Sequence, residues 1–406
     1  MDKMGAWLDE LIKHLEDNIL SFWIHNTIDN IHGGFIGRIT GNGEKQYEAK
    51  KGAVLNARIM WTFSAAYRIL KKDIYLKMAV RAKQYFDEYF IDKTNGGVFW
   101  SVDYQGKPFD TNKHTYAIGF AIYAYSEFYR ATNDISAKNT AINLFNDIET
   151  HCYDNVYGGY FEAFSETWES IEDMRLSEKD ENAIKTMNTH LHILEPYTNL
   201  FKIWKSPLLK NRLSELVTIF LEKIIDSNSY HVNLYFNSLW ETKGDLISYG
   251  HDIETTWLLS EAAITLKNPH LEKMVSMIIP QMIHAAEEGI ISDGSMVYEH
   301  NLTTRLIDYD RHWWVQAEAI VGFYHHYINT GNNRFAERTI KLWEFIKSKM
   351  IDSDSGEWVW SVDRSGETTI VNDRMGFWKC PYHHARMCLE IVETLKYKRV
   401  IHSIRV

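Results

Sequence analysis

The 406-residue sequence predicts an all-α fold: an (α/α)6 barrel of twelve helices, with short β-hairpins between its repeats. Three observations favour this class. A glycine-containing pattern recurs along the chain, and two stretches of helical periodicity separate its copies. Proline is rare: 6 of the 406 residues, about 1.5%, are proline, against a usual share of ~5%. Because no Pro- or Ser-rich linker interrupts the repeats, we expect one catalytic domain spanning residues 1–406.

The recurring pattern is a hydrophobic residue, Asp, a few polar residues, one or two glycines and then alternating aromatics. Its reference glycines are Gly34, Gly97, Gly159, Gly294 and Gly356, with spacings of 63, 62, 135 and 62 residues. The gap of 135 is about two periods, which predicts a further copy near residue 226. The segment IIDSNSYHVNLYFNSLWE at 224–241 supplies it without the glycine, so six units cover the chain.

Each copy of the pattern predicts a short β-hairpin, since Gly and Asn suit the turn and strings such as VFWSV alternate with period two. The stretches between hairpins have helical periodicity, as at residues 54–69 and 78–89 of the first unit. An open solenoid could also stack such helix pairs, but it needs polar caps at its ends. Six units without evident caps favour a closed barrel.

Charge and sequence pattern exclude several classes of partner. The formal net charge is −10 and no block of five basic residues occurs, which argues against nucleic acid. The N-terminal segment MDKMGAWLDELIKHLEDNIL predicts an amphipathic helix rather than a signal peptide, and the longest uncharged stretch is too short for a membrane span of ~20 residues. Three cysteines without a CxxC favour a reducing compartment. We expect a cytoplasmic protein, a monomer or weak homo-oligomer.

Candidate functional residues cluster at the head of the helix after each hairpin. If rotation relates the units, these heads converge on one rim of the barrel around a central cavity. They carry Arg58; His114 and Tyr116; Asn188 and His192; His251 and Glu254; Trp313, Trp314, Gln316 and Glu318; and Trp378, His383 and Arg386. A lone histidine on an apolar helix is usually a core residue, but four histidine-bearing heads in register favour function.

Three chemistries could use such a ring. Zinc needs three or four ligands, but HExxH is missing, and His190 and His192 face different sides of a helix, so we expect no metal. Glycoside hydrolysis needs a pair of carboxyl groups, and the ring is poor in Asp. The sequence contains no glycine-rich phosphate-binding loop, so nothing in it indicates a nucleotide cofactor.

The third chemistry, proton abstraction beside a carbonyl, fits best. Imidazole has a pKa of ~6.5, which suits a base and an acid near neutral pH. Two histidines on opposite faces of a planar enediolate would invert a carbon, an arginine would stabilise the developing negative charge, and tryptophans would stack on sugar rings.

The helix-head strings resemble those of a known family. VLNARIMW, NKHTYAIGFAIYA, KTMNTHLHILEPYT, SYGHDIETTWLL, WWVQAEAIVGF and WKCPYHHARMCLE are similar, in the same order and from end to end, to cellobiose 2-epimerases of the N-acylglucosamine 2-epimerase superfamily. The resemblance implies an (α/α)6 barrel. It also implies conversion of the reducing-end glucose of β-1,4-linked disaccharides to mannose at C2, without a metal or other cofactor.

The resemblance also implies catalytic roles for five residues. His383 is the expected general acid/base at C2 and takes part in ring opening, and His251 is its partner on the opposite face. His192 and Arg58 are expected to polarise the carbonyl and hold the cis-enediolate. Glu254 would orient His251 or help to open the sugar ring.

The expected sugar contacts are Tyr116 and Asn188 at the reacting sugar, and Trp378 with one of Trp313 or Trp314 as stacking platforms. Which of these two tryptophans stacks on the sugar stays open in the sequence.

Departures from the family pattern leave the substrate open. His384 stands where we expect Asn, and Asn56-Ala57 stands where we expect His-Ser. Asp252 and the WWVQAE string favour the disaccharide branch over N-acylglucosamine epimerases. Mannobiose 2-epimerases share the motifs, and an aldose–ketose isomerase could use the same site. A carboxylate-dependent glycoside hydrolase is the alternative of a different class.

Overall fold

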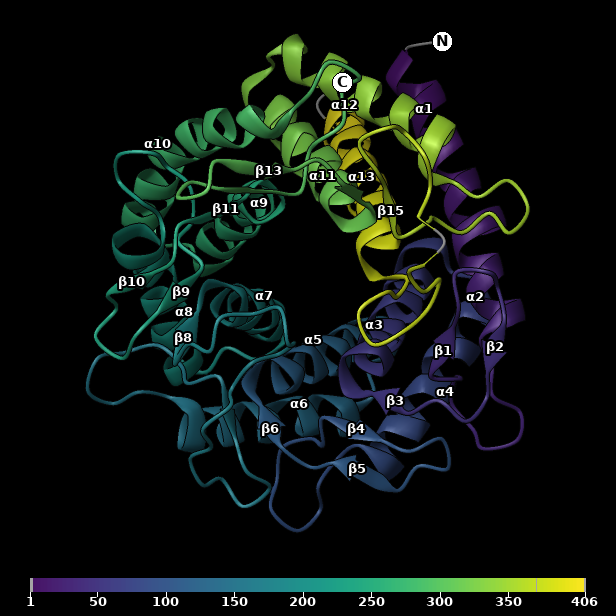
Figure 1. Ribbon diagram of the computed structural model, residues 1–406, viewed down its shortest axis with the longest axis vertical. Coiled ribbons are helices and arrows are strands. Elements are labelled where there is room, and N and C mark those ends of the chain that lie inside the picture. The colour runs from purple at the N-terminus through teal and green to yellow at the C-terminus, as the bar shows by residue number, and fades with distance from the viewer. Residues whose placement is uncertain (1–2, 370, 405–406) are drawn as a thin grey trace.

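The computed structural model describes residues 3–369 and 371–404, and their helices form two concentric rings (Figure 1). The inner ring consists of α3 (Ala53–Leu70), α5 (Thr115–Thr132), α7 (Met187–Ile203), α9 (Tyr249–Leu266), α11 (Trp313–Thr330) and α13 (Tyr382–Ile404). Each inner helix contacts the next, and α13 contacts α3, so the ring is closed.

The outer ring covers the inner one. Its members are α1 (Lys3–Lys13) and α2 (Ser21–Asn26), α4 (Asp73–Tyr89), α6 (Ile135–Asp147), α8 (Pro207–Ile219), α10 (Pro269–Ala286) and α12 (Asn333–Phe345). Five further helical turns extend them: η1 (His14–Leu20), η2 (Ile148–Cys152), η3 (Phe220–Ile224), η4 (Glu287–Gly289) and η5 (Ile346–Met350). Since η1 joins α1 to α2 without a break, the described chain has twelve helices, and the (α/α)6 barrel is confirmed.

Four inner helices are joined to the next outer helix by a tight turn. Lys71, Asn133, Lys267 and Gly331 take left-handed backbone conformations at the ends of α3, α5, α9 and α11. Inner helices also approach one another closely, since a Cβ at Gly119 would lie 2.5 Å from the carbonyl oxygen of His192. None of the helices in the described ranges combines the length and apolar character that a membrane span requires.

The hairpins differ in detail from the prediction. Each glycine turn closes on an isolated bridge, such as Ile91 with Val98, and the expected copy near residue 226 is present as the bridge of Ile225 with Val232. The strands contain only two or three residues. They are β1 (Arg38–Ile39), β2 (Lys45–Gln46), β3 (Lys51–Gly52), β4 (Ser101–Val102), β5 (Pro108–Asp110), β6 (Lys113–His114), β7 (Ala163–Phe164), β8 (Lys185–Thr186), β9 (Tyr235–Phe236), β10 (Thr242–Lys243), β11 (Leu246–Ser248), β12 (Glu299–Asn301), β13 (Leu306–Asp308), β14 (Arg311–His312) and β15 (Ser361–Val362).

Strand pairing links neighbouring units. The strand that leads into an inner helix pairs with a strand of the next unit, as β3 does with β4 and β14 with β15, all antiparallel. The bridge between Ile39 and Met375 joins the first unit to the last. The short strands therefore tie the helix heads into a ring, which is the rim on which the candidate residues stand.

Buried ion pairs fix the heads of the first three inner helices. In each unit the repeated aspartate pairs with a lysine two residues before the helix: Asp29 with Lys51 at 2.8 Å, Asp92 with Lys113 at 2.7 Å and Asp154 with Lys185 at 2.7 Å. These aspartates also accept hydrogen bonds from backbone N–H groups of their own turns. One carboxylate thus holds both the turn and the start of the helix.

Candidate active site

A cavity of about 570 Å³ lies at the heads of the inner helices. All ten predicted site residues line it: Arg58, Tyr116, Asn188, His192, His251, Glu254, Trp313, Trp314, Trp378 and His383. Two further head residues have other surroundings. His114 packs on Trp100 with ring centroids 4.3 Å apart, and the Gln316 amide exchanges hydrogen bonds with the backbone of Met296.

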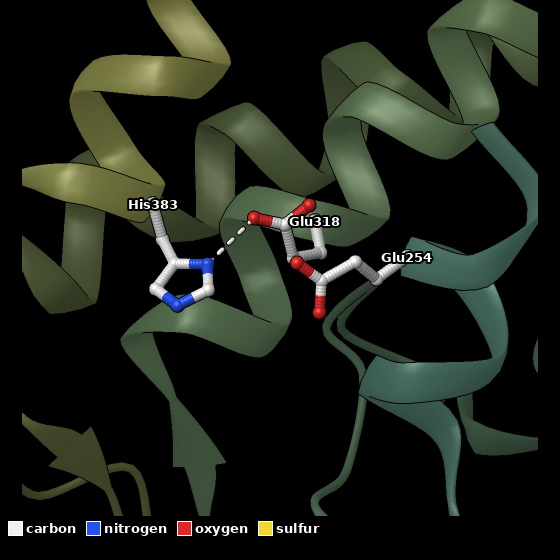
Figure 2. Close-up of side chains that lie close together, drawn as sticks. All are labelled: Glu254, Glu318 and His383. Carbon is white, nitrogen blue, oxygen red and sulfur yellow. Dashed lines mark hydrogen bonds and ion pairs between the residues drawn. The ribbon is translucent and has the colours of Figure 1, made fainter. Parts of the chain in front are cut away.

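His383 is held by Glu318 (Figure 2). Its Nδ1 lies 2.7 Å from Glu318 Oε1, while Nε2 points away from that carboxylate. Burial, followed by the charges of Arg58 and Arg386, keeps the pKa of His383 well below its usual range. The neutral ring therefore donates from Nδ1 and keeps a lone pair on Nε2.

Arg386 is the centre of a buried carboxylate cluster. Its guanidinium lies 2.6 Å from Glu254 and 2.7 Å from Glu318, and it also contacts Glu195 and the Tyr382 hydroxyl. Burial alone would lower the pKa of Arg386, but these carboxylates raise it well above the usual value. The Arg386 guanidinium thus positions three glutamates, and one of them, Glu318, orients His383.

His192 lies at a kink in α7. Its backbone is non-helical, with φ −89° and ψ 15°. Pro196, four residues later, has no N–H to donate to the His192 carbonyl, which explains the kink. Nδ1 of His192 lies 3.1 Å from Glu195 Oε2. Burial lowers the pKa of His192, so this ring is also neutral.

His251 has a different partner from the one expected. Its Nδ1 lies 2.8 Å from the hydroxyl of Ser248, the residue before α9, whereas Glu254 donates nothing to it and instead accepts from Arg386. Burial, followed by the charge of His192, lowers the pKa of His251 to about 3. The rings of Trp314 and His251 are 4.7 Å apart, and those of Trp314 and His383 are 5.8 Å apart.

Arg58 brings positive charge to the cavity. Its Nη2 donates to the Tyr116 hydroxyl at 2.8 Å, and its guanidinium carbon lies 4.1 Å from the centre of the Phe120 ring. Its Nε is buried without a hydrogen-bond partner among the described residues. An anionic oxygen in the cavity could therefore pair with this guanidinium.

Glu254 is a candidate acid. Its Oε1 accepts from Arg386, while Oε2 is buried with no partner in the described chain. Burial and the nearby Glu318 raise the pKa of Glu254 well above its usual value. The raised pKa favours the protonated form of Glu254, which makes this carboxyl group a candidate proton donor to a ligand.

The tryptophans form two groups around the cavity. Trp313 is 3% exposed and packs on Trp360, with centroids 4.6 Å apart. Trp378 lies 6.1 Å from Tyr116. Trp314 is the more exposed of the adjacent pair and lies nearer to the two histidines.

One group of side chains has donor atoms near enough for a metal ion. Glu254, Glu318 and His383 have candidate ligand atoms within 4.8 Å of one another (Figure 2). The Arg386 guanidinium binds both carboxylates, however, and Nδ1 of His383 is bonded to Glu318. Because the guanidinium already supplies positive charge to both carboxylates, the three side chains form a poor set for a cation, although Glu254 Oε2 has no partner among the described residues.

The sequence does not indicate every residue of the site. The irregular segment 174–181 and Trp360 line the cavity. Behind the wall, Glu195 and Tyr382 contact Arg386, but in the sequence a glutamate in mid-helix and a tyrosine in an apolar run look like packing residues. Only the closure of the barrel brings these residues to the site.

The positions that depart from the family pattern lie behind the site. His384 is fully buried, and its Nε2 lies 2.9 Å from Glu357 Oε1. The angle between the two groups is too unfavourable for a hydrogen bond. The Asn56 amide donates to the Gly52 carbonyl at 2.8 Å. Both side chains support the helix heads, and neither lines the cavity.

Comparison with known proteins agrees with this geometry. The family model for N-acylglucosamine 2-epimerase (GlcNAc 2-epimerase) matches residues 34–386. The chain belongs to the N-acylglucosamine 2-epimerase family. It is therefore an enzyme, a carbohydrate-epimerising isomerase.

Several family members resemble the chain over nearly its whole length. A cellobiose 2-epimerase of Bacteroides fragilis is 50% identical, covering 94% of this chain and 98% of the relative. One from Dictyoglomus turgidum is 37% identical over 95% of this chain and 98% of its own. The solved cellobiose 2-epimerase of Bacillus thermoamylovorans has a TM-score of 0.92 at 40% identity, covering 96% of this chain and 100% of that one.

More distant solved structures share the fold. A D-mannose isomerase structure has a TM-score of 0.83 at 23% identity, covering 95% of this chain and 97% of its own. A family 76 α-mannanase of Bacteroides thetaiotaomicron has a TM-score of 0.61 at 13% identity, covering 99% and 98%. The barrel is thus shared with glycoside hydrolases, and the side chains of the cavity must distinguish their chemistries.

Proposed function

We propose that this enzyme inverts C2 of the reducing-end sugar of β-1,4-linked disaccharides, converting cellobiose to glucosyl-mannose through a cis-enediolate. The observation that carries the proposal is that three buried histidines line one cavity together with an arginine that has no carboxylate partner among the described residues, in a chain 50% identical to a cellobiose 2-epimerase. A cavity of about 570 Å³ lies within the usual range for small-molecule sites, ~300–1,000 Å³.

The reaction begins with ring opening. One of His383 and His251 accepts the proton of the O1 hydroxyl, while neutral Glu254 donates its proton to the ring oxygen. The C1–O5 bond breaks and leaves an aldehyde. The raised pKa of Glu254 and the unpartnered Oε2 support this role.

Epimerisation follows at C2. The second histidine removes the C2 proton, and the electron pair forms the C1–C2 double bond while negative charge develops on O1. Arg58 and His192 stabilise this oxygen. The first histidine returns its proton to the opposite face of C2. Ring closure then transfers the proton of the second histidine to O1 and that of O5 to Glu254, so every group regains its initial state.

Sugar stacking would hold the substrate between these groups. Trp314 lies beside both His251 and His383, which supports it as the platform for the reacting sugar. Trp378 lies beside Tyr116 and is the second platform. Tyr116 and Asn188 contact the reacting sugar in this arrangement.

A product assay on cellobiose, mannobiose and N-acetylglucosamine tests the proposal. We expect cellobiose to give glucosyl-mannose as the main product. Turnover of mannobiose or N-acetylglucosamine alone would instead assign the enzyme to another branch of its family. Release of free glucose that survives His383→Ala would indicate a hydrolase.

A second candidate function uses the same site. A relative 24% identical to this chain is named D-mannose isomerase. If the enediolate received its proton at C1 instead of C2, the product would be a ketose. Glucosyl-fructose as the main product from cellobiose would support that alternative.

A further inference from the structure

A buried cation stands shortly before five of the inner helices: two residues before α3, α5, α7 and α11, and three residues before α13. Four of these cations have a carboxylate partner. The ion pairs are Lys51–Asp29 at 2.8 Å, Lys113–Asp92 at 2.7 Å, Lys185–Asp154 at 2.7 Å and Lys379–Glu357 at 2.7 Å. The fifth cation is Arg311, in β14 before α11.

Arg311 has no carboxylate partner among the described residues, although it is only 2% exposed. Its Nη1 donates to the Tyr309 carbonyl at 2.7 Å, and its Nε is buried without a hydrogen-bond partner in the described part of the chain. The preceding residue, Asp310, interacts electrostatically with Arg311, but these two described residues form no ion pair. Buried arginines are rarely unpaired, because burial removes their hydration.

The missing partner is a change in the repeat. In the first three units an aspartate follows the first residue of the isolated bridge, as Asp92 follows Ile91. In the fifth unit the bridge begins at Ile290, and Ile291 occupies the place of the aspartate. The fifth unit therefore has the cation, but an isoleucine stands where the first three units have the paired aspartate.

A second cavity, of about 490 Å³, opens beside Arg311 on the outer side of the barrel. Its wall carries three more cations, Lys341, Lys349 and Arg364, together with Phe345. The Arg311 guanidinium lies 5.7 Å from the Phe345 ring, so it is next to another residue of the wall.

Two acids of this wall have partners of their own. Asp293 accepts from the backbone and hydroxyl of Ser295. Glu344 pairs with Lys347 at 2.9 Å. The four cations of the wall outnumber its two carboxylates, and one of these, Glu344, is already paired with Lys347. Neither Arg311 nor the three other cations line the active-site cavity, whose nearest wall residue in β14 is His312.

We infer that this outer cavity binds the phosphate group of a small phosphorylated molecule. Arg311 is the buried anchor, and Lys341, Lys349 and Arg364 neutralise the rest of the charge. A phosphate group carries about −1.5 to −2 charges and three acceptor oxygens, which matches several cations better than one carboxylate does. The bound anion replaces the aspartate that the fifth unit lacks.

Calorimetric titration of the full-length protein with inorganic phosphate and with glucose 1-phosphate tests the inference, against chloride at equal ionic strength. We expect saturable binding of at least one phosphate compound. Arg311→Gln and Lys349→Gln should each weaken it by about tenfold or more. Lys273→Gln, which removes an exposed charge on α10, is the matched control and should leave binding unchanged.

The relative affinities of the two compounds identify the ligand: tighter glucose 1-phosphate binding indicates a sugar phosphate, and equal or tighter inorganic phosphate binding indicates the free ion. Absence of saturable binding overturns the inference, as does equal weakening by Lys273→Gln or displacement of phosphate by cellobiose. If Arg311→Gln does not fold, the exposed Lys349→Gln and Lys341→Gln decide: unchanged binding in both rejects the site.

Discussion

At the residue scale, the three cavity histidines share one arrangement. Each has Nδ1 beside a fixed partner: Glu318 for His383, Glu195 for His192 and Ser248 for His251. Burial is the main cause that lowers their pKa values. The rings are therefore neutral through the physiological range and can accept protons through Nε2.

Replacing one of the two proposed bases separates proton removal from proton return. His383→Asn and His251→Asn should each reduce turnover by about 10²–10⁴-fold with the fold intact. In each variant the remaining histidine can still exchange the C2 hydrogen of one epimer for deuterium from heavy water. One variant should therefore label cellobiose and the other should label glucosyl-mannose. Nuclear magnetic resonance of cellobiose and glucosyl-mannose, each incubated with each variant, measures this. Near-normal turnover in either variant would contradict the two-base assignment.

Glu318 is a positioning residue for His383. Glu318→Gln should lower kcat by about 10–100-fold with little change in KM, because the His383 ring loses its carboxylate acceptor while the cavity keeps its shape. The control is the same substitution in the His383→Asn background, where it should have no further effect on the residual rate. Independent, multiplicative losses would mean that Glu318 acts elsewhere in the reaction.

The helix-head residues could be predicted because their chemistry contrasts with the apolar helices around them. Glu195 and Arg386 form the deeper layer, and nothing in a single sequence distinguishes a glutamate in mid-helix that orients a histidine from one that pairs on the surface. The kink at His192 is different. Pro196 four residues later is a visible signal, and it could have indicated a distorted helix at this position.

At the element scale, the turn–helix ion pairs hold the cavity rim. Lys113→Met leaves Asp92 buried without its cation and should reduce the free energy of unfolding by about 3–5 kcal/mol. Lys93→Met, an exposed lysine beside the same aspartate, is the control and should have little effect. Denaturant unfolding followed by circular dichroism measures both. Equal stability of the two variants would show that the pair contributes nothing.

Helices were more predictable than strands. The helical periodicity at 54–69 and 78–89 corresponds to α3 and α4, because both helices bury regular faces. The strands contain two or three residues, and their register is set by the neighbouring unit, as when Lys51 pairs with Val102. That register depends on how the helices pack and cannot be read from one hairpin.

At the scale of the whole molecule, the first and last units lock together through buried aromatic residues. Trp23 donates to Glu357 at 2.7 Å, and Trp358 donates to Nε2 of His14 at 2.7 Å. Acceptance by Nε2 requires His14 to be unprotonated at this nitrogen. Burial, followed by the charge of His384, lowers the pKa of His14 to about 4.

This closure predicts a pH dependence of stability. Between pH 6.5 and about 4 the unfolded state binds a proton at His14 that the folded state excludes, so stability falls as the pH falls through that window. The contribution is at most ~1.4 kcal/mol per pH unit. His14→Gln should reduce the slope of unfolding free energy against pH, measured by urea unfolding, while His270→Gln on the exposed start of α10 should not. Equal slopes in the two variants would reject this contribution.

The repeat count made the closed barrel predictable, since six units without evident caps need a partner for each end. The means of closure was not predictable. Pairing of Ile39 with Met375 and of Trp23 with Glu357 joins residues more than 300 positions apart, and no local pattern marks them.

In the proposed reaction, C2 of the reducing-end sugar loses and regains a proton without any added cofactor. Incubation of the chelator-treated enzyme with cellobiose in heavy water would detect this exchange. We expect glucosyl-mannose carrying one deuterium at C2, because the returned proton comes from groups that exchange with solvent. Glucosyl-mannose without deuterium at C2, or glucosyl-fructose as the main product, would contradict it.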